Sequence, residues 1–278
     1  MLVNMKELLE YADKKGVCIG AFSVYNMEMV MGVIEACEEL DMPAIIQIAE
    51  SRFKYSPLSI IGPLMIAAAK KAKVKIAVHL DHGLTFDNIE RALKYGFTSV
   101  MYDGSKLSFN ENIENTKKVV EIASKYNASV EAELGVVGGN EGMGNFSVKY
   151  TDVEEAKYFV DSTNIDALAI AIGNAHGNYK GEPKLNFKIL QEINEEVKKP
   201  LVLHGGSGIN DEDFQKAIRF GIRKINIATS NMQALVNSIK QCVLSNNSLD
   251  YFKLNQEIVN KVRNNTIDLM RVFNMDII

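Results

Sequence analysis

The feature that most constrains the fold of this chain is a regular alternation of short apolar runs with longer segments of helical periodicity. Each run is short and mostly apolar, and it is followed by a segment whose apolar residues recur every three or four positions. We predict strands at residues 17–24, 44–49, 75–80, 99–103, 128–134, 166–172, 200–205 and 224–229. Strands this uniformly apolar are typical of a parallel sheet covered on both faces, and eight strand–helix units close a barrel. The sequence therefore predicts an α/β fold, a single (β/α)8 TIM barrel.

The segments between these strands are predicted to be helices. They are residues 27–40, 58–72, 86–95, 111–126, 152–162, 186–197, 211–220 and 231–244. An amphipathic helix is expected before the first strand, and one or two extra helices after Leu244. No linker rich in Pro, Gly or Ser divides the chain, so residues 1–278 are expected to form one domain. An open dinucleotide-binding sheet is disfavoured, because the first strand leads into SVYNMEM and not into a glycine-rich turn.

Composition argues against several classes of partner and location. The net charge is −4 and no basic run contains interleaved aromatic residues, so nucleic acid is not an expected partner. No stretch of 18 apolar residues predicts a membrane span, and the N-terminal segment lacks the apolar core of a signal peptide. Cys18, Cys37 and Cys242 are odd in number and far apart, which favours buried thiols in a reducing, cytoplasmic location.

All four histidines lie in segments at, or directly after, the predicted carboxyl ends of strands. The motifs are HLDHG, with His79 and His82, GNAHG, with His176, and HGGSG, with His204. In a (β/α)8 barrel these strand ends meet at one mouth, where active sites lie. Three imidazoles from three strand ends, with a fourth position open, are typical of catalytic zinc. We predict that His82, His176 and His204 bind Zn²⁺, and that His79, inside its strand, supports the site without being a ligand.

Carboxylates occupy similar positions. Asp103 ends the fourth predicted strand and Glu133 the fifth, where Glu131 shares its strand face. A buried carboxylate needs a cation or hydrogen bonds. We predict a salt bridge inside the barrel for Glu131, and participation in a metal site for Asp103 and Glu133.

Glycine-rich segments follow the sixth and seventh strands. AHGNYKG and HGGSG, together with NIAT after them, can bring backbone N–H groups close to an anion. Loops at this end of such barrels often bind phosphate. Lys180 can add a positive charge, so these segments predict a phosphate site.

Five motifs in this order, HLDHG, EAELGVVGG, GNAHGNY, LHGGSG and KINIAT, resemble those of the class II, zinc-dependent ketose-bisphosphate aldolases. The resemblance covers the chain from AFSVYN to about Leu244. It implies reversible cleavage of a ketose 1,6-bisphosphate to dihydroxyacetone phosphate and glyceraldehyde 3-phosphate. Fructose 1,6-bisphosphate is the first expectation, and tagatose bisphosphate or another ketose phosphate is the alternative. The resemblance also implies a homodimer or higher homo-oligomer.

The resemblance implies roles for individual residues. Asp81 matches the aspartate that exchanges a proton with the C4 oxygen, and Glu141 the loop glutamate that takes a proton from dihydroxyacetone phosphate. Asp103 and Glu133 match a second or alternative metal site. A monovalent cation, Na⁺ or K⁺, is common near the substrate phosphate. The positions that match dihydroxyacetone phosphate binding are Gly177, Lys180, Gly205, Gly206, Ser207, Asn226, Ile227, Ala228 and Thr229.

Two departures concern the distal half of the substrate. Where many members have Ser or Thr followed two positions on by Gly, this chain has Ala49 and Ser51, with Arg52 next. The Asp-Pro-Arg found near the C-terminus of many bisphosphate aldolases is replaced by SNNSLDYF, residues 245–252. The departures leave open a phosphosugar-binding protein without activity. A metal-dependent hydrolase is a further alternative, because the paired histidines of HLDH also suit a hydrolase metal site.

Overall fold

The computed structural model describes residues 1–139, 149–177, 179, 181, 183–245 and 250–275, and its centre is a closed barrel of eight parallel strands. Around the barrel the strands run β1-β10-β9-β7-β5-β4-β3-β2, and every neighbouring pair is parallel. The strands are β1 (Ile19–Ser23), β2 (Ala44–Ala49), β3 (Ile76–Gly83), β4 (Ser99–Tyr102), β5 (Ser129–Leu134), β7 (Ala167–Ile170), β9 (Leu201–Leu203) and β10 (Ile222–Ile227). The predicted TIM barrel is confirmed.

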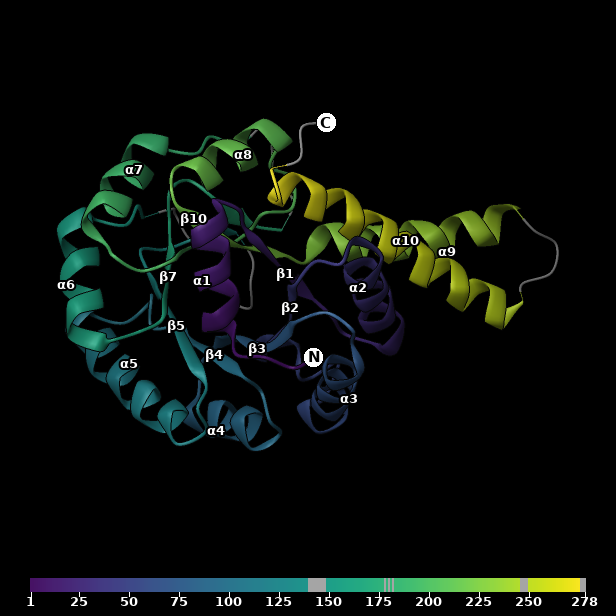
Figure 1. Cartoon of the computed structure of the whole chain (residues 1–278), viewed down its shortest axis with the longest axis horizontal. Helices are drawn as coiled ribbons and strands as arrows, with labels where there is room; N and C mark the ends of the chain where they lie inside the picture. The colour runs from purple at the N-terminus through teal and green to yellow at the C-terminus, as the bar shows by residue number, and fades with distance from the viewer. Residues whose placement is uncertain (140–148, 178, 180, 182, 246–249, 276–278) are drawn as a thin grey trace.

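A helix follows each of the eight strands. These helices are α2 (Met27–Leu40), α3 (Leu58–Lys71), α4 (Phe86–Lys94), α5 (Phe109–Ser124), α6 (Val153–Thr163), α7 (Phe187–Glu196), α8 (Asp211–Arg219) and α9 (Thr229–Ser245). Helices α2 to α8 cover the outside of the barrel, whereas most of α9 extends beyond it (Figure 1). Local signals fix many of their starts. Ser108, for example, accepts a hydrogen bond from the backbone of Glu111 while the Glu111 side chain accepts one from Ser108, a capping box that begins α5.

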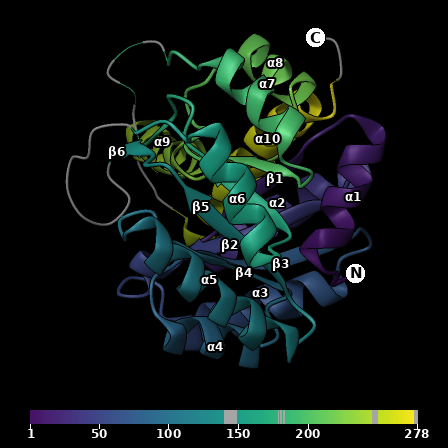
Figure 2. The same cartoon turned by 90° about the vertical axis from the view of Figure 1, so that its left-hand side faces the viewer.

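An additional helix, α1 (Met5–Lys15), closes the amino-terminal end of the barrel. Its face of Met5, Leu8, Leu9 and Ala12 is buried against small and apolar side chains that point into the barrel from five of the strands. Figure 1 shows α1 lying across the barrel opening, and Figure 2 shows it on the side opposite the short strand β6 (Gly138–Gly139). Apolar side chains fill the amino-terminal end of the barrel. A polar site is therefore expected at the carboxyl end of the strands.

Among the residues that the structure describes after the barrel, one further helix, α10 (Tyr251–Phe273), runs antiparallel to α9. The paired helices project beyond the barrel (Figure 1), and α10 packs along α2 with Val259 and Val262 buried. Large side chains remain exposed near the far end of the pair, including Leu244 at 87% and Phe252 at 79%. The predicted strands and helices all exist. The clearest differences in boundary are that β3 continues three residues beyond the predicted Leu80, to Gly83, and that Thr229, predicted as strand, begins α9.

The cysteines only partly follow expectation. Cys18 and Cys37 are buried thiols, and burial raises the pKa of both well above the usual range. Cys242, on α9, is half-exposed, so the prediction of burial is wrong for it, because α9 leaves the barrel before reaching this residue. No helix in the described part of the chain combines the length and apolarity that a bilayer span requires.

Candidate active site

The carboxyl end of β3 is bent by a β-bulge. Leu80 pairs with Val100 and Gly83 with Tyr102, so three steps along β3 match two along β4. His82 has a φ of 41°, an uncommon conformation for a residue with a side chain. A Cβ at Gly83 would lie 2.4 Å from the Met101 carbonyl oxygen, so only glycine fits there. A bulge re-aims side chains that would otherwise alternate. It lets the neighbours Asp81 and His82 both reach the site.

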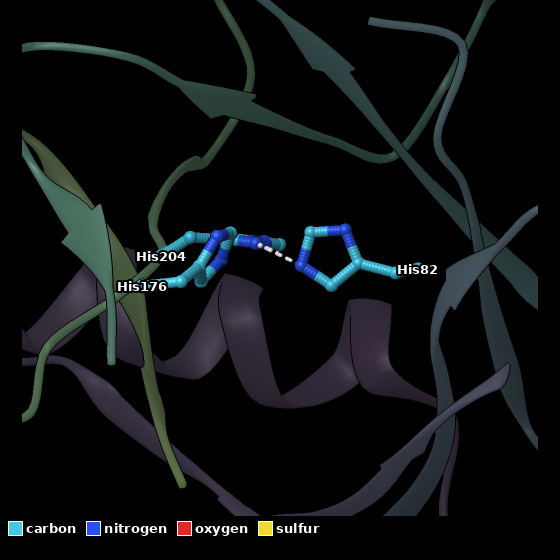
Figure 3. Close-up of side chains that lie close together, drawn as sticks. All are labelled: His82, His176 and His204. Atoms are coloured by element: carbon cyan, nitrogen blue, oxygen red, sulfur yellow. Dashed lines mark hydrogen bonds between the residues drawn. The ribbon is translucent and has the colours of Figure 1, made fainter. Parts of the chain in front are cut away.

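Three imidazoles converge at the mouth of the barrel (Figure 3). His82 comes from β3, His204 directly follows β9, and His176 belongs to β8 (Ala175–His176), a two-residue strand paired with β6. His204 Nδ1 and His82 Nε2 are 3.0 Å apart, and one ring nitrogen from each of the three residues lies within 4.8 Å of the others. The structure therefore brings together the three predicted zinc ligands.

Two residues absent from the sequence prediction hold this arrangement. Asn174, fully buried, accepts a hydrogen bond from the Ile172 N–H and donates one to the His204 carbonyl. The Tyr179 hydroxyl donates to the Gly205 carbonyl and accepts from the Ala175 N–H, each at 2.9 Å. The loop with His176 is thereby tied to the loop with His204. Both residues lie in the GNAHGNY motif, but only the folded chain reveals these partners.

The three histidines fit a divalent metal. Burial, and then the proximity of His82, lower the pKa of His176 to about 3, and the same two causes lower that of His204 well below its ordinary value. Neutral imidazoles offer lone pairs to a metal. Nε2 of His176 is buried and finds no hydrogen-bond partner among the described residues. Two nitrogens on a tetrahedral zinc are about 3.3 Å apart, close to the observed separation of His82 and His204. Metal binding would satisfy the unpaired nitrogen.

Asp103 and Glu133 face the other ring nitrogen of His82. His82 Nδ1 lies 2.9 Å from Asp103 Oδ2 and 4.0 Å from Glu133 Oε2. Although burial alone would raise it, hydrogen bonds from His82 and Ser105 hold the pKa of Asp103 below its ordinary value. Burial, and next the Asp103 charge, raise the pKa of Glu133 well above its ordinary value. These three side chains form a second group of possible metal ligands, so the two nitrogens of His82 face two neighbouring positions.

A cavity beside His176 contains most of the predicted substrate-binding positions. Asp81, itself buried, lines it and accepts a hydrogen bond at Oδ1 from the Asn226 amide, 3.0 Å away. The predicted positions that line this cavity are Gly177, Gly205, Ser207, Asn226, Ala228 and Thr229. Two others lie behind it: Ile227 is fully buried in the apolar layer, and the Gly206 N–H donates to the Asn226 carbonyl.

Ser23 and Gln47 line the same cavity and were missed by sequence reasoning. Both are buried at the carboxyl ends of β1 and β2, and Gln47 Nε2 donates to Ser23 Oγ at 3.3 Å. The signal was present as a lone polar residue within AIIQIA. The predicted catalytic Glu141 and the predicted phosphate-binding Lys180 lie outside the described residues.

Comparison with known proteins finds aldolases among those most similar in sequence. The family model "Fructose-bisphosphate aldolase class-II" matches residues 3–276. A fructose-bisphosphate aldolase of Staphylococcus aureus is 42% identical over 256 residues, which cover 90% of this chain and 88% of the relative. A sulfofructosephosphate aldolase of Alkalicoccus urumqiensis is 41% identical over 247 residues, covering 88% and 86%.

The crystal structure of the YdjI aldolase from Escherichia coli K12 superposes with a TM-score of 0.89 at 35% identity, covering 98% of this chain and 97% of that one. The family model spans the barrel and its terminal helices. The chain belongs to the class II fructose-bisphosphate aldolase family.

Proposed function

We propose that this aldolase is zinc-dependent and reversibly cleaves fructose 1,6-bisphosphate into dihydroxyacetone phosphate and glyceraldehyde 3-phosphate. The single observation that supports this most is the convergence of His82, His176 and His204, of which His176 lines the same cavity as Asp81. A hydrolase of the same fold needs no phosphate-binding loops, whereas this cavity is lined by the glycine-rich segments with Gly177 and Gly205. A binding protein without turnover would not need a carboxylate beside the metal position.

Zinc held by the three histidines would act as a Lewis acid and stabilise the negative charge that develops on the substrate oxygens. Asp81 borders the cavity with its carboxylate fixed by Asn226, so it can exchange a proton with the C4 hydroxyl. Glu141 is proposed as the base that removes the C–H proton from dihydroxyacetone phosphate. Asp103 and Glu133 are proposed as ligands of a second or alternative metal position around His82 Nδ1.

The phosphate of the dihydroxyacetone half is proposed to bind where the ends of β9 and β10 meet. Gly205 has a φ of 66°, and a Cβ there would lie 2.2 Å from the Ala175 carbonyl oxygen, so this turn requires glycine. The predicted positions Gly206, Ser207 and Asn226 to Thr229 follow or face this turn. Ser207 Oγ already accepts from the Ser230 N–H, which orders the start of α9. Lys180 and a monovalent cation are proposed to balance the phosphate charge.

The names of two relatives differ in one acidic group of the sugar. One is a fructose-bisphosphate aldolase and another a sulfofructosephosphate aldolase. Arg52 ends a single 3-10 turn, Glu50–Arg52, directly after β2. The pKa of His176 is lowered mainly by burial and by His82, and the positive charge of Arg52 is close enough to lower it further. An anionic distal group near Arg52 is consistent with this position.

The experiment that tests the proposed substrate is a cleavage assay that detects dihydroxyacetone phosphate. The zinc-loaded protein is given fructose 1,6-bisphosphate, tagatose 1,6-bisphosphate and a ketose 1-phosphate with a sulfonate at the far end. We expect the highest kcat/KM with fructose 1,6-bisphosphate. A higher value for another sugar would correct the substrate, and cleavage of none would reject the activity.

Replacing Gln47 with leucine is expected to lower kcat/KM about 10-fold, since one substrate hydrogen bond contributes about 1–2 kcal/mol. Gln47 Oε1 is buried without a partner among the described residues and its side chain lines the cavity. Bound zinc, measured by elemental analysis, should not change because Gln47 is no ligand. An unchanged kcat/KM would show that Gln47 does not contact substrate.

Three wider expectations belong to the proposal. The chain is proposed to act as one domain, in the cytoplasm, where thiols such as Cys18 and Cys37 stay reduced. It is proposed to form a homodimer or higher homo-oligomer. The projecting pair α9 and α10 supports this, because it exposes apolar side chains such as Leu244 and Phe252 that a second copy could cover.

A further inference from the structure

An ion pair is enclosed inside the barrel beneath the histidines. Glu131, on β5, and Lys224, on β10, are both 0% exposed, and Lys224 Nζ lies 2.8 Å from Glu131 Oε2. The other carboxylate oxygen, Oε1, lies 2.8 Å from Nε2 of His204. Glu131 therefore contacts a proposed metal ligand on one side and a lysine on the other. The salt bridge predicted for Glu131 from the sequence is confirmed.

Stability is a poor explanation for this pair. Taking two charges out of water costs several kcal/mol, and well-packed apolar residues in place of a buried pair are often as stable or more so. The surrounding strand positions show that this barrel accepts apolar side chains: Ala167, Ala169 and Val202 all lie in its inner core. The pair is more readily explained by what it orients.

Glu131 fixes how His204 faces the metal position. A carboxylate can only accept hydrogen bonds, so the proton of a neutral His204 lies on Nε2, toward Glu131. The lone pair is then on Nδ1, which faces His82 Nε2 at 3.0 Å. A carboxylate behind a metal-binding histidine selects the ring nitrogen that binds and holds the ring in place.

Lys224 extends the same network to Asp81. Its Nζ also donates to the Asn226 amide oxygen, 2.7 Å away. Because that oxygen faces the lysine, the amide nitrogen points the other way and donates to Asp81 Oδ1. Without the Lys224 ammonium group, either the oxygen or the nitrogen of the Asn226 side-chain amide could turn toward Asp81.

We propose that Glu131 and Lys224 are positioning residues that together set the orientation of His204 toward the metal and of Asn226 toward Asp81. This inference rests on the proposed metal site at the histidines. The pair contacts neither metal nor substrate; it acts through His204 and Asn226. It thus couples the metal position to the carboxylate proposed to handle the C4 proton.

The test compares Glu131→Gln, Lys224→Met and the double variant, with Arg223→Met as matched control. Arg223 is the neighbour of Lys224 on β10 and pairs outside the barrel with Asp13 at 2.7 Å. The readouts are zinc affinity by competition with a chromophoric chelator, the visible absorption spectrum of the Co²⁺-substituted protein, kcat with KM, and Tm. Each single variant leaves a buried charge unpaired and is expected to lower Tm.

The double variant removes both charges, so its Tm is expected to return close to that of the unmodified protein. If the pair positions the site, zinc affinity still falls about 10–100-fold, the Co²⁺ spectrum changes, and kcat falls more than KM changes. Arg223→Met should alter none of these three. If the double variant has the same zinc affinity and the same Co²⁺ spectrum as the unmodified protein, the positioning role is overturned, while the proposed metal site is not. Failure of the unmodified protein to bind Co²⁺ or Zn²⁺ would overturn the proposed metal site as well.

Discussion

Replacing His176 with alanine is expected to lower kcat by about 10³-fold and zinc affinity by about 10²-fold or more. Structural zinc sites bind with about 10–16 kcal/mol from four ligands, so one ligand contributes on the order of 3 kcal/mol. The larger effect on kcat follows because a displaced metal no longer faces the reacting oxygens, and Lewis-acid catalysis depends on that placement. Nε2 of His176 has no hydrogen-bond partner in the described protein, so its loss should leave no other group unpaired.

The measurement is zinc content after dialysis against a weak chelator, together with kcat at saturating zinc. Tm without metal serves as the control and should change little, because His176 lies in the short strand β8 outside the main barrel. Retention of zinc and activity by His176→Ala would show that the three histidines are not the metal ligands, and would leave His82 with Asp103 and Glu133 as the alternative group.

Replacing Glu141 with alanine is expected to lower kcat by about 10²–10⁴-fold, the usual contribution of a general base. Zinc affinity should stay within experimental error, because Glu141 is proposed to act on the substrate and not on the metal. Its role depends on the family motif and on its place in a glycine-rich loop, GGNEGMGN. The most specific readout is exchange of the dihydroxyacetone phosphate C–H proton with solvent deuterium, followed by NMR.

Glu154→Ala is the matched control, an exposed glutamate in the first turn of α6 that should leave exchange and kcat unchanged. Loss of exchange in Glu141→Ala with zinc still bound would support its role as base. Normal exchange in Glu141→Ala would instead make it a solvated loop residue, and the base would have to be sought among the carboxylates that line the mouth, beginning with Asp81.

Much of the fold could be predicted because each strand–helix unit has a local signature. Apolar strands of five or six residues, such as β1 and β2, and capped amphipathic helices, such as α5, are encoded within short windows. The parallel barrel then follows from repetition. The two-residue pairing of β6 with β8 could not be foreseen, because it depends on the contact of two loops that are distant in sequence.

The site was predictable in its residue types and less so in its contacts. Histidines at three strand ends indicated a metal, and the structure brings those three together. Strand alternation alone would have directed Asp81 and His82 to opposite faces, and the bulge before Gly83 changes this. The partners of Glu131, which are His204 and Lys224, come from the end of β9 and from β10, far along the chain from β5. Pairings of that kind depend on barrel closure, and no local pattern specifies them.

The most direct test of the central claim is a chelation and restoration experiment on the cleavage reaction. Dihydroxyacetone phosphate release from fructose 1,6-bisphosphate is followed before chelator, after chelator and dialysis, and after addition of one equivalent of zinc per chain. The account predicts loss of cleavage with the metal and its return with zinc. Cleavage that continues in metal-free protein would contradict it, because the three histidines at the mouth of the barrel would then have no part in the chemistry.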